Sequence, residues 1–72
     1  MNMYCVKYDV KKNGGCFGRR VYITADTAKQ AKARFVEVTN GNCYYDNKCH
    51  AFHVSVTKAN DVIIAEQYAV IS

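Results

Sequence analysis

VYITADTAKQAKARFVEVTNG, residues 21 to 41, decides the fold because its apolar residues change from a two-residue to a helical period. Val21, Ile23 and Ala25 alternate with polar residues, which is typical of a half-buried strand. Further along, apolar residues recur three or four positions apart, as on one face of a helix, at Ala28, Ala31, Phe35 and Val38. The stretch therefore predicts a strand leading directly into an amphipathic helix.

Both ends of this helix carry residues that favour helix termination. The Thr27 hydroxyl can accept from an amide of the first turn, while the Gln30 side chain, three residues later, reaches back as in a capping box. Asn40 and Gly41 favour the other end, because glycine adopts a left-handed conformation without steric cost. We therefore expect the helix to begin at Thr27 and to end before Gly41.

The residues before Val21 predict a β-hairpin. Apolar residues alternate with polar ones from Tyr4 to Val10, which predicts a first strand at about residues 3 to 11. The glycine-rich NGGCFG, residues 13 to 18, predicts the turn, and the second strand runs from Arg19 to Ala25, antiparallel to the first.

After the helix, residues 42 to 50 predict an irregular loop that carries Tyr44 and Tyr45. Alternation from Phe52 to Val56 predicts a third strand, and Ala59-Asn60-Asp61 predicts a turn into a fourth strand at about 62 to 71, whose register is open. The fold class is therefore α+β, with ββαββ order, in a single domain covering residues 1 to 72. We expect a four-stranded antiparallel sheet with one helix packed on one face.

This arrangement divides the side chains into a core and an exposed sheet face. The predicted core contains Val6, Tyr8, Val21, Ile23, Phe52, Val54 and Val56 beneath Ala28, Ala31, Phe35 and Val38. The opposite face is predicted to show Cys5, Lys7, Arg20, Tyr22, Thr24, His53, Ser55 and Thr57. Because most of these residues are polar, this face can stay in water or bind a partner.

The sequence does not favour an enzyme or a metal protein. Cys43 or Cys49 could act as a nucleophile with His50 or His53 as base, but no pattern supplies oxyanion donors or a cleft. The spacing C-x5-C-H-x2-H, residues 43 to 53, lacks the paired C-x2-C of zinc sites. We therefore expect no catalytic residue, no cofactor and no metal.

The first residues and the cysteines both point to the cytoplasm. Lys7 and Asp9 interrupt the start where a signal peptide needs an apolar run, and no stretch approaches the ~20 apolar residues of a membrane span. The four cysteines are expected as free thiols, with Cys43 to Cys49 the more plausible bridge in an oxidising compartment. We expect a cytoplasmic protein without membrane contact.

Charge is distributed unevenly along the chain. Residues 1 to 34 carry a formal charge of +6, and residues 35 to 72 carry −2. The cations gather around the glycine-rich turn, with one aromatic residue, Phe17, between them. We predict a partner-binding surface for an anionic partner that consists of Lys11, Lys12, Phe17, Arg19 and Arg20, assisted by Lys29 and Lys32. A solvated hairpin tip without specific function is the alternative.

Residues 21 to 35 also carry a family resemblance. Ile23, Ala25, Thr27, Gln30, Ala31 and Lys32 follow the pattern Ile-x-Ala-x-Ser/Thr-x-x-Gln/Glu-Ala-Lys. This resembles very short phage and mobile-element proteins, including small anti-CRISPR inhibitors of type I systems. The matching residues are structural, so no binding residue is carried over. The resemblance implies an inhibitor without enzymatic activity that docks on a host defence complex.

The sequence therefore predicts a non-enzymatic phage-type inhibitor of a host defence ribonucleoprotein in the bacterial cytoplasm. Two alternatives remain open. The protein could bind nucleic acid directly through the basic hairpin of residues 11 to 20, or it could be a structural subunit that dimerises through the fourth strand, Val62 to Ile71.

Overall fold

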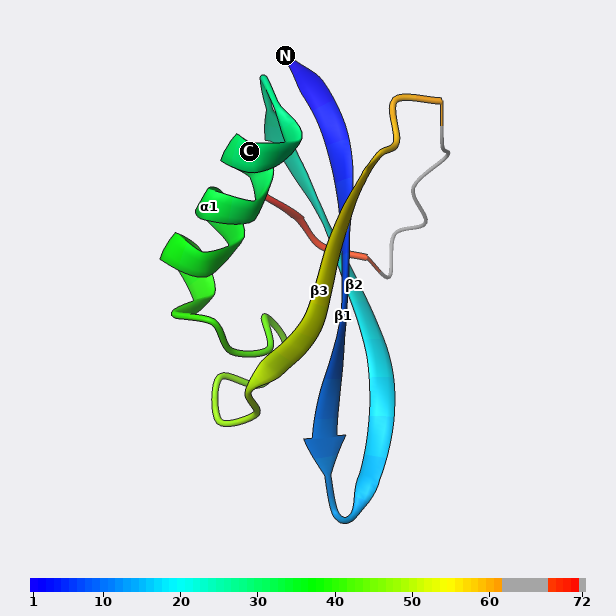
Figure 1. Cartoon of the computed structure of the whole chain (residues 1–72), viewed down its shortest axis with the longest axis vertical. Coiled ribbons are helices and arrows are strands. Elements are labelled where there is room, and N and C mark those ends of the chain that lie inside the picture. The colour runs from blue at the N-terminus through cyan, green and yellow to red at the C-terminus, as the bar shows by residue number, and fades with distance from the viewer. Residues whose placement is uncertain (62–67, 72) are drawn as a thin grey trace.

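The computed structural model describes residues 1–61 and 68–71. Within these residues the elements are β1 (Asn2–Lys12), β2 (Gly15–Ala25), α1 (Ala28–Thr39), β3 (Ala51–Lys58) and β4 (Val70–Ile71). The strands form one mixed sheet in the order β3-β1-β2-β4, and α1 packs on one face (Figure 1). The α+β class with one helix on a four-stranded sheet is therefore confirmed. The all-antiparallel sheet is wrong, because β4 runs parallel to β2.

The first two strands form a long hairpin with a very short turn. They pair from Asn2 opposite Ala25 to Lys12 opposite Gly15, so only Asn13 and Gly14 remain in the turn. Both turn residues have positive φ, 53° and 79°, as a tight primed hairpin turn requires. The antiparallel pairing is confirmed, but residues 15 to 18 belong to β2 and not to the predicted turn.

The helix begins and ends where its capping residues predict. Thr27 Oγ1 accepts from the Gln30 amide at 3.2 Å, and Gln30 Oε1 accepts from the Asp26 amide at 3.1 Å. At the other end, Asn40 adopts a left-handed conformation and its amide donates to the Val36 carbonyl at 2.7 Å. These contacts satisfy amide and carbonyl groups that have no partner within the helix.

The helix buries a narrower stripe than predicted. Ala31, Phe35 and Thr39, four residues apart, face the sheet, and Thr39 Oγ1 donates to the Phe35 carbonyl at 2.6 Å. Ala28 and Val38, both predicted in the core, are exposed. Val38 lies to one side of the row through Ala31, Phe35 and Thr39, and the helix covers the sheet along that row alone.

A bulge in β3 changes which residues face the helix. Lys7 lies opposite Ser55 and Asp9 opposite Phe52, so two residues of β3, His53 and Val54, oppose the one residue between them. His53 has a φ of 53°. Because one extra residue reverses the alternation, Phe52 leaves the predicted core for the opposite face, and Ala51 takes the buried position instead.

The segment after β3 begins with the predicted turn, at Asn60 and Asp61. The Ala59 amide donates to the Met3 carbonyl at 2.8 Å, and the Met3 amide donates to Asn60 Oδ1 at 2.6 Å, so this turn is bound to the start of β1. Residues 62 to 67 of the predicted fourth strand lie outside the described residues. The described strand, β4, lies at the far edge of the sheet beside β2, where the Tyr22 amide donates to the Ala69 carbonyl at 2.9 Å.

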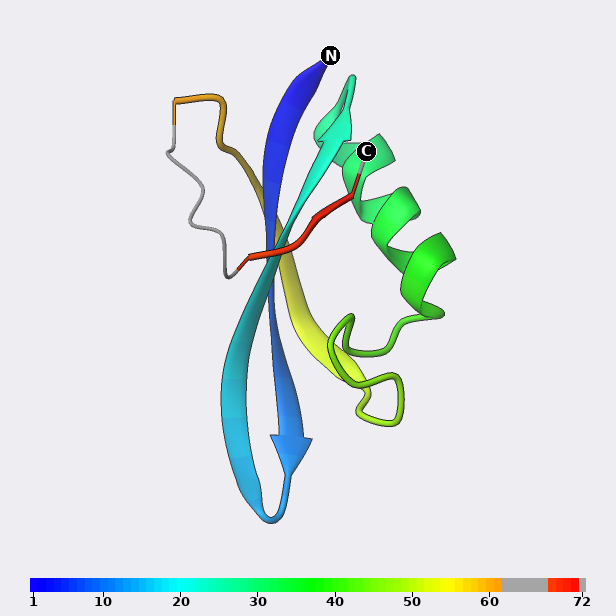
Figure 2. The same ribbon diagram turned by 180° about the vertical axis from the view of Figure 1, so that it is seen from behind.

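The sheet face away from α1 is only partly open. Cys5 and Tyr22, predicted to be exposed there, are buried with Ala59, and Met3 and Tyr68 pack against them. Toward the hairpin turn the same face has exposed polar side chains. Seen from behind, the hairpin projects beyond α1 (Figure 2). We call the part of this face that lies toward the hairpin turn the open face. In the described part of the chain, no helix has the length and apolar character to cross a membrane.

Candidate anion-binding surface

The predicted basic residues of the hairpin lie on both sides of the two strands. Lys12 shares a side with buried Val10, and Arg19 shares it with buried Val21, so both lie on the helix side. Lys11 and Arg20 alternate with them and lie on the open face. We call residues 11–20 the basic arm, and its cations form two surfaces instead of one.

The two helix lysines lie away from the basic arm. Lys29 and Lys32 are exposed on the first turns of α1, which follows the end of β2. The Asn13-Gly14 turn is at the other end of the hairpin, and the molecule is 37 Å long (Figure 1). The structure therefore does not bring Lys29 and Lys32 together with the arm, although both remain accessible to a large partner.

On the helix side of the arm, one cation is paired with an acid. Lys12 Nζ lies 3.3 Å from Asp46 Oδ2 in the loop after α1. The Lys48 amide, the Lys12 ammonium and the Cys49 thiol together hold the pKa of Asp46 below its ordinary value. Phe17 is 47% exposed, and the Arg19 guanidinium lies 5.9 Å from its ring centroid. This side thus presents the Arg19 guanidinium, which pairs with no acid among the described residues, next to an accessible ring.

On the open face, two cations lie directly opposite each other. Lys7 pairs with Arg20 of β2 on one side and with Ser55 of β3 on the other, and we call these three residues the basic row. Like charges directly opposite across strands repel each other. Sequence reasoning placed Lys7 on this face but did not include it in the binding surface.

An aromatic ring lies beside the basic row. The Arg20 guanidinium is 5.1 Å from the Tyr68 ring centroid, and the Tyr68 ring packs edge-on against Tyr22 at 5.9 Å. A side-chain hydrogen bond with Tyr22, followed by the nearby Tyr68, raises the pKa of Arg20. Arg20 therefore stays charged at every physiological pH.

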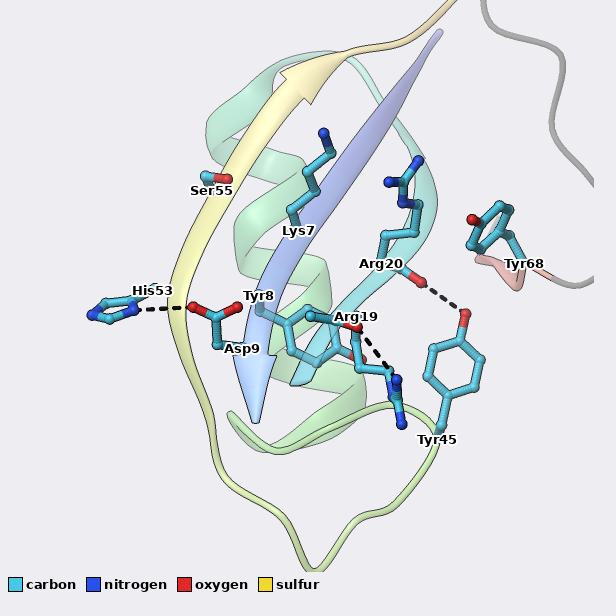
Figure 3. A pocket seen from close by; sticks show the side chains of 10 residues that line it. Lys7, Tyr8, Asp9, Arg19, Arg20, Tyr45, His53, Ser55 and Tyr68 are labelled. Carbon is cyan, nitrogen blue, oxygen red and sulfur yellow. Dashed lines mark hydrogen bonds and ion pairs between the residues drawn. The ribbon is translucent and has the colours of Figure 1, made fainter. Parts of the chain in front are cut away.

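An acid of β1 and a histidine of the β3 bulge lie on the same face. His53 Nδ1 lies 3.1 Å from Asp9 Oδ2, and the imidazole is largely exposed (Figure 3). The Phe52 ring is 4.8 Å from the His53 ring and 5.9 Å from Lys11 Nζ. Among the described residues, Asp9 is the one acid on the open face. A protonated His53 screens the negative charge of its carboxylate.

The basic row crosses a shallow depression of about 780 Å³, which is also lined by Asp9, His53, Arg19, Tyr45 and Tyr68 (Figure 3). One edge is closed by Tyr45, whose hydroxyl donates to the Arg20 carbonyl at 2.7 Å and accepts from the Ala69 amide at 3.3 Å. The loop after α1 thereby reaches around the free edge of β2. The resulting surface combines cations, a hydroxyl and aromatic rings.

The two cysteines predicted as possible nucleophiles, Cys43 and Cys49, both contact other side chains. The Cys49 thiol donates to Asp46 Oδ2 at 3.4 Å, and partial burial together with this carboxylate raises the pKa of Cys49. Cys43 is buried next to the Tyr8 hydroxyl at 3.5 Å. Within residues 1–61 and 68–71, neither histidine hydrogen bonds to a thiol, and no three His, Cys, Asp or Glu side chains converge as metal ligands would.

Comparison with protein-family models, curated proteins and solved structures finds no match. The function of this protein must therefore be inferred from its side chains and their surroundings.

Proposed function

We propose that this protein is a non-enzymatic inhibitor that docks on a host defence ribonucleoprotein in the bacterial cytoplasm, with the basic arm as its principal contact. The charge of the arm carries the proposal. Within the described residues, Lys12 is the one cation of the arm that pairs with an acid, while Lys11, Arg19 and Arg20 contact aromatic rings. Such cations are available to an anionic partner.

The shape of the arm supports the same proposal. Beyond Val10 the first strand has no β3 partner, so the last residues of the hairpin pair with each other alone within the described sheet. A narrow, two-stranded projection can enter a groove that a globular surface cannot reach. The half-exposed Phe17 ring supplies apolar contact area on this projection.

The partner class comes from the resemblance of residues 21 to 35 to small phage proteins. A non-enzymatic mode of action fits the cysteines, because the Cys49 thiol is held by Asp46 and the Cys43 thiol is buried. A nucleophile needs a thiolate, and partial burial together with the Asp46 carboxylate raises the pKa of the Cys49 thiol.

The test is capture of partners from a host lysate, with and without nuclease, followed by mass spectrometry. Nuclease degrades free nucleic acid, whereas RNA held inside a ribonucleoprotein is protected. We expect subunits of a type I defence complex in both samples. Capture that nuclease abolishes would replace this proposal with the direct nucleic-acid alternative, and absence of any ribonucleoprotein would overturn it.

Variants assign the contact to the arm. Replacing Lys11, Lys12, Arg19 and Arg20 by Gln should abolish capture. The free energy of unfolding should change by no more than about 1 kcal/mol, since three of the four residues are exposed, Arg20 is half-buried, and surface charges contribute little. For a matched pair, K11Q/K12Q removes two charges from the arm, and K48Q/K58Q removes two from elsewhere. The first should weaken capture and the second should not. Equal capture by both would exclude the arm.

A further inference from the structure

The basic row is unfavourable for the protein by itself. Lys7 and Arg20 are cross-strand partners on one face, and Ser55 lies on the other side of Lys7. Within the described residues, Lys7 makes no ion pair, and its side chain is exposed. A phosphate above the row would accept from the ammonium, the guanidinium and the Ser55 hydroxyl, and would turn the repulsion into attraction.

Aromatic rings lie on either side of this row. Tyr68 lies beyond Arg20, at the β2 edge, and the Arg20 guanidinium is 5.1 Å from its ring centroid. Phe52 is on β3, opposite Asp9, one step closer to the hairpin turn. Rings and guanidinium planes are the groups on which unpaired bases stack, and stacking tolerates any base sequence.

From this combination we propose that the open face binds single-stranded nucleic acid, with the backbone phosphate on the basic row and bases against Tyr68 and Phe52. A duplex keeps its base faces covered, so it can use the cations but not the rings. The depression is shallow and open, as a surface that follows an extended strand needs to be.

The bulge at His53 fits this proposal. Asp9 lies on the same face as Lys7 and would repel a phosphate, but His53 Nδ1 lies 3.1 Å from its carboxylate. In the bulge, the His53 backbone has a φ of 53°, a left-handed conformation that side chains disfavour. The His53–Asp9 pair marks the end of the path that the phosphates follow. Lys7 and Arg20 are then the groups that hold the nucleic-acid strand.

This inference rests on the proposed function in one respect, the assumption of an anionic partner. Its surface is the basic row, of which Arg20 alone also belongs to the basic arm. Fluorescence anisotropy of the purified protein tests it with labelled single-stranded RNA and DNA of about 12 nucleotides, a length within the range that small single-strand-binding domains cover. A duplex of the same sequence is the comparison. We expect both single strands to bind and the duplex to bind at least tenfold more weakly.

The variants separate cations from rings. K7Q/R20Q should weaken binding at least tenfold and reduce the log-log salt slope by about 0.7, because both cations hold the same phosphate and each neutralised phosphate contributes roughly 0.7 for single strands. K48Q/K58Q, with the same change of charge, should stay within about threefold of the parent, an allowance for exposed charges outside the site. Y68L should weaken binding about tenfold without changing the salt slope, because stacking releases no counterions. Thermal unfolding checks that each variant folds.

Several outcomes would overturn the inference. The first is that the protein does not bind single strands. The second is that K7Q/R20Q and K48Q/K58Q lose equal affinity for them. The third is that K11Q/K12Q loses affinity and K7Q does not. Capture of the ribonucleoprotein without oligonucleotide binding would overturn this inference and leave the proposed function intact. Oligonucleotide binding without capture of any ribonucleoprotein would support this inference and overturn the proposed function.

Discussion

The Tyr8 side chain joins three parts of the molecule at one residue. Its ring lies 4.9 Å from the fully buried Phe35 ring, and its hydroxyl accepts from the Tyr44 amide at 3.0 Å. Burial, and then the contact with the Cys43 thiol, raise the pKa of Tyr8 well above the ordinary value. The core is therefore held together by a phenol that stays protonated.

Phe35→Ala tests the packing of α1 on the sheet. The ring has no exposed surface, so its removal should lower the free energy of unfolding by about 3 kcal/mol through lost burial and a cavity. Val36→Ala, the next residue and 47% exposed, should change it by less than about 0.5 kcal/mol. Denaturant unfolding measures both. Similar effects for the two variants would mean that another face of the helix packs on the sheet.

Tyr8→Phe tests the buried phenol through pH. At pH 7 the variant should be less stable by about 1 kcal/mol, because the Tyr44 amide loses its acceptor. Because the folded pKa is raised, the wild type loses stability as pH rises above the ordinary tyrosine pKa of about 10, where the unfolded phenol ionises. The difference between the two proteins should therefore shrink above that pH in urea unfolding. A gap that stays constant up to pH 11 would contradict the burial of the hydroxyl.

At the scale of elements, two short irregularities decide which residues share a surface. The two-residue turn at Asn13 and Gly14 sets the register that places Lys7 opposite Arg20. The bulge at His53 moves Phe52 from the helix side to the open face. In both cases a shift of one residue would move every following side chain to the other face.

Two neighbouring glycines test the turn. Gly14 has a φ of 79° with no atom near a new Cβ, so Gly14→Ala should cost about 1 kcal/mol from backbone strain alone. Gly15 lies outside the left-handed region, and its Cβ would meet the Phe17 ring at an ordinary 3.5 Å. Gly15→Ala should therefore leave stability within about 0.5 kcal/mol. Thermal unfolding compares them, and a larger loss in Gly15→Ala would place the turn elsewhere.

At the scale of the whole molecule, Tyr45 connects the loop after α1 to the edge of the sheet. Its hydroxyl bridges the Arg20 carbonyl and the Ala69 amide, and so fills the ladder position next to β4. Three segments distant in sequence thereby meet at one edge of the open face. The position of Tyr68 beside Arg20 depends on this junction.

Tyr45→Phe removes both hydrogen bonds of the junction. The Tyr22 amide, which donates to the Ala69 carbonyl at 2.9 Å, should then exchange with solvent several-fold faster. Amides at the centre of the β1–β2 ladder should keep their rates. Tyr44→Phe is the matched control, because its hydroxyl has no hydrogen-bond partner among the described residues. Equal exchange at Tyr22 in both variants would show that Tyr45 does not hold β4.

Part of the candidate site could be read from the sequence. Lys11, Arg19 and Arg20 were predicted as binding residues, and all three are accessible. Lys7 was missed because residues 13 to 18 were all assigned to the turn. Asn13 and Gly14 alone form a two-residue turn, and counting back from them pairs Lys7 with Arg20. Nothing local in the sequence places Tyr68 beside Arg20.

The sequence by itself determined the elements whose signals are local: the hairpin, the helix from its cap at Thr27 to Asn40, and the strand alternation of β1 and β2. Capping, turn chemistry and periodicity act between residues a few positions apart, so they are visible in one chain. Only the tertiary structure decided the parallel position of β4, the bulge at His53 and the burial of Thr39 in place of Val38. Each depends on contacts between distant segments, such as Asn60 with Met3 and Tyr45 with Ala69, whose free energy exists only when the segments are packed together.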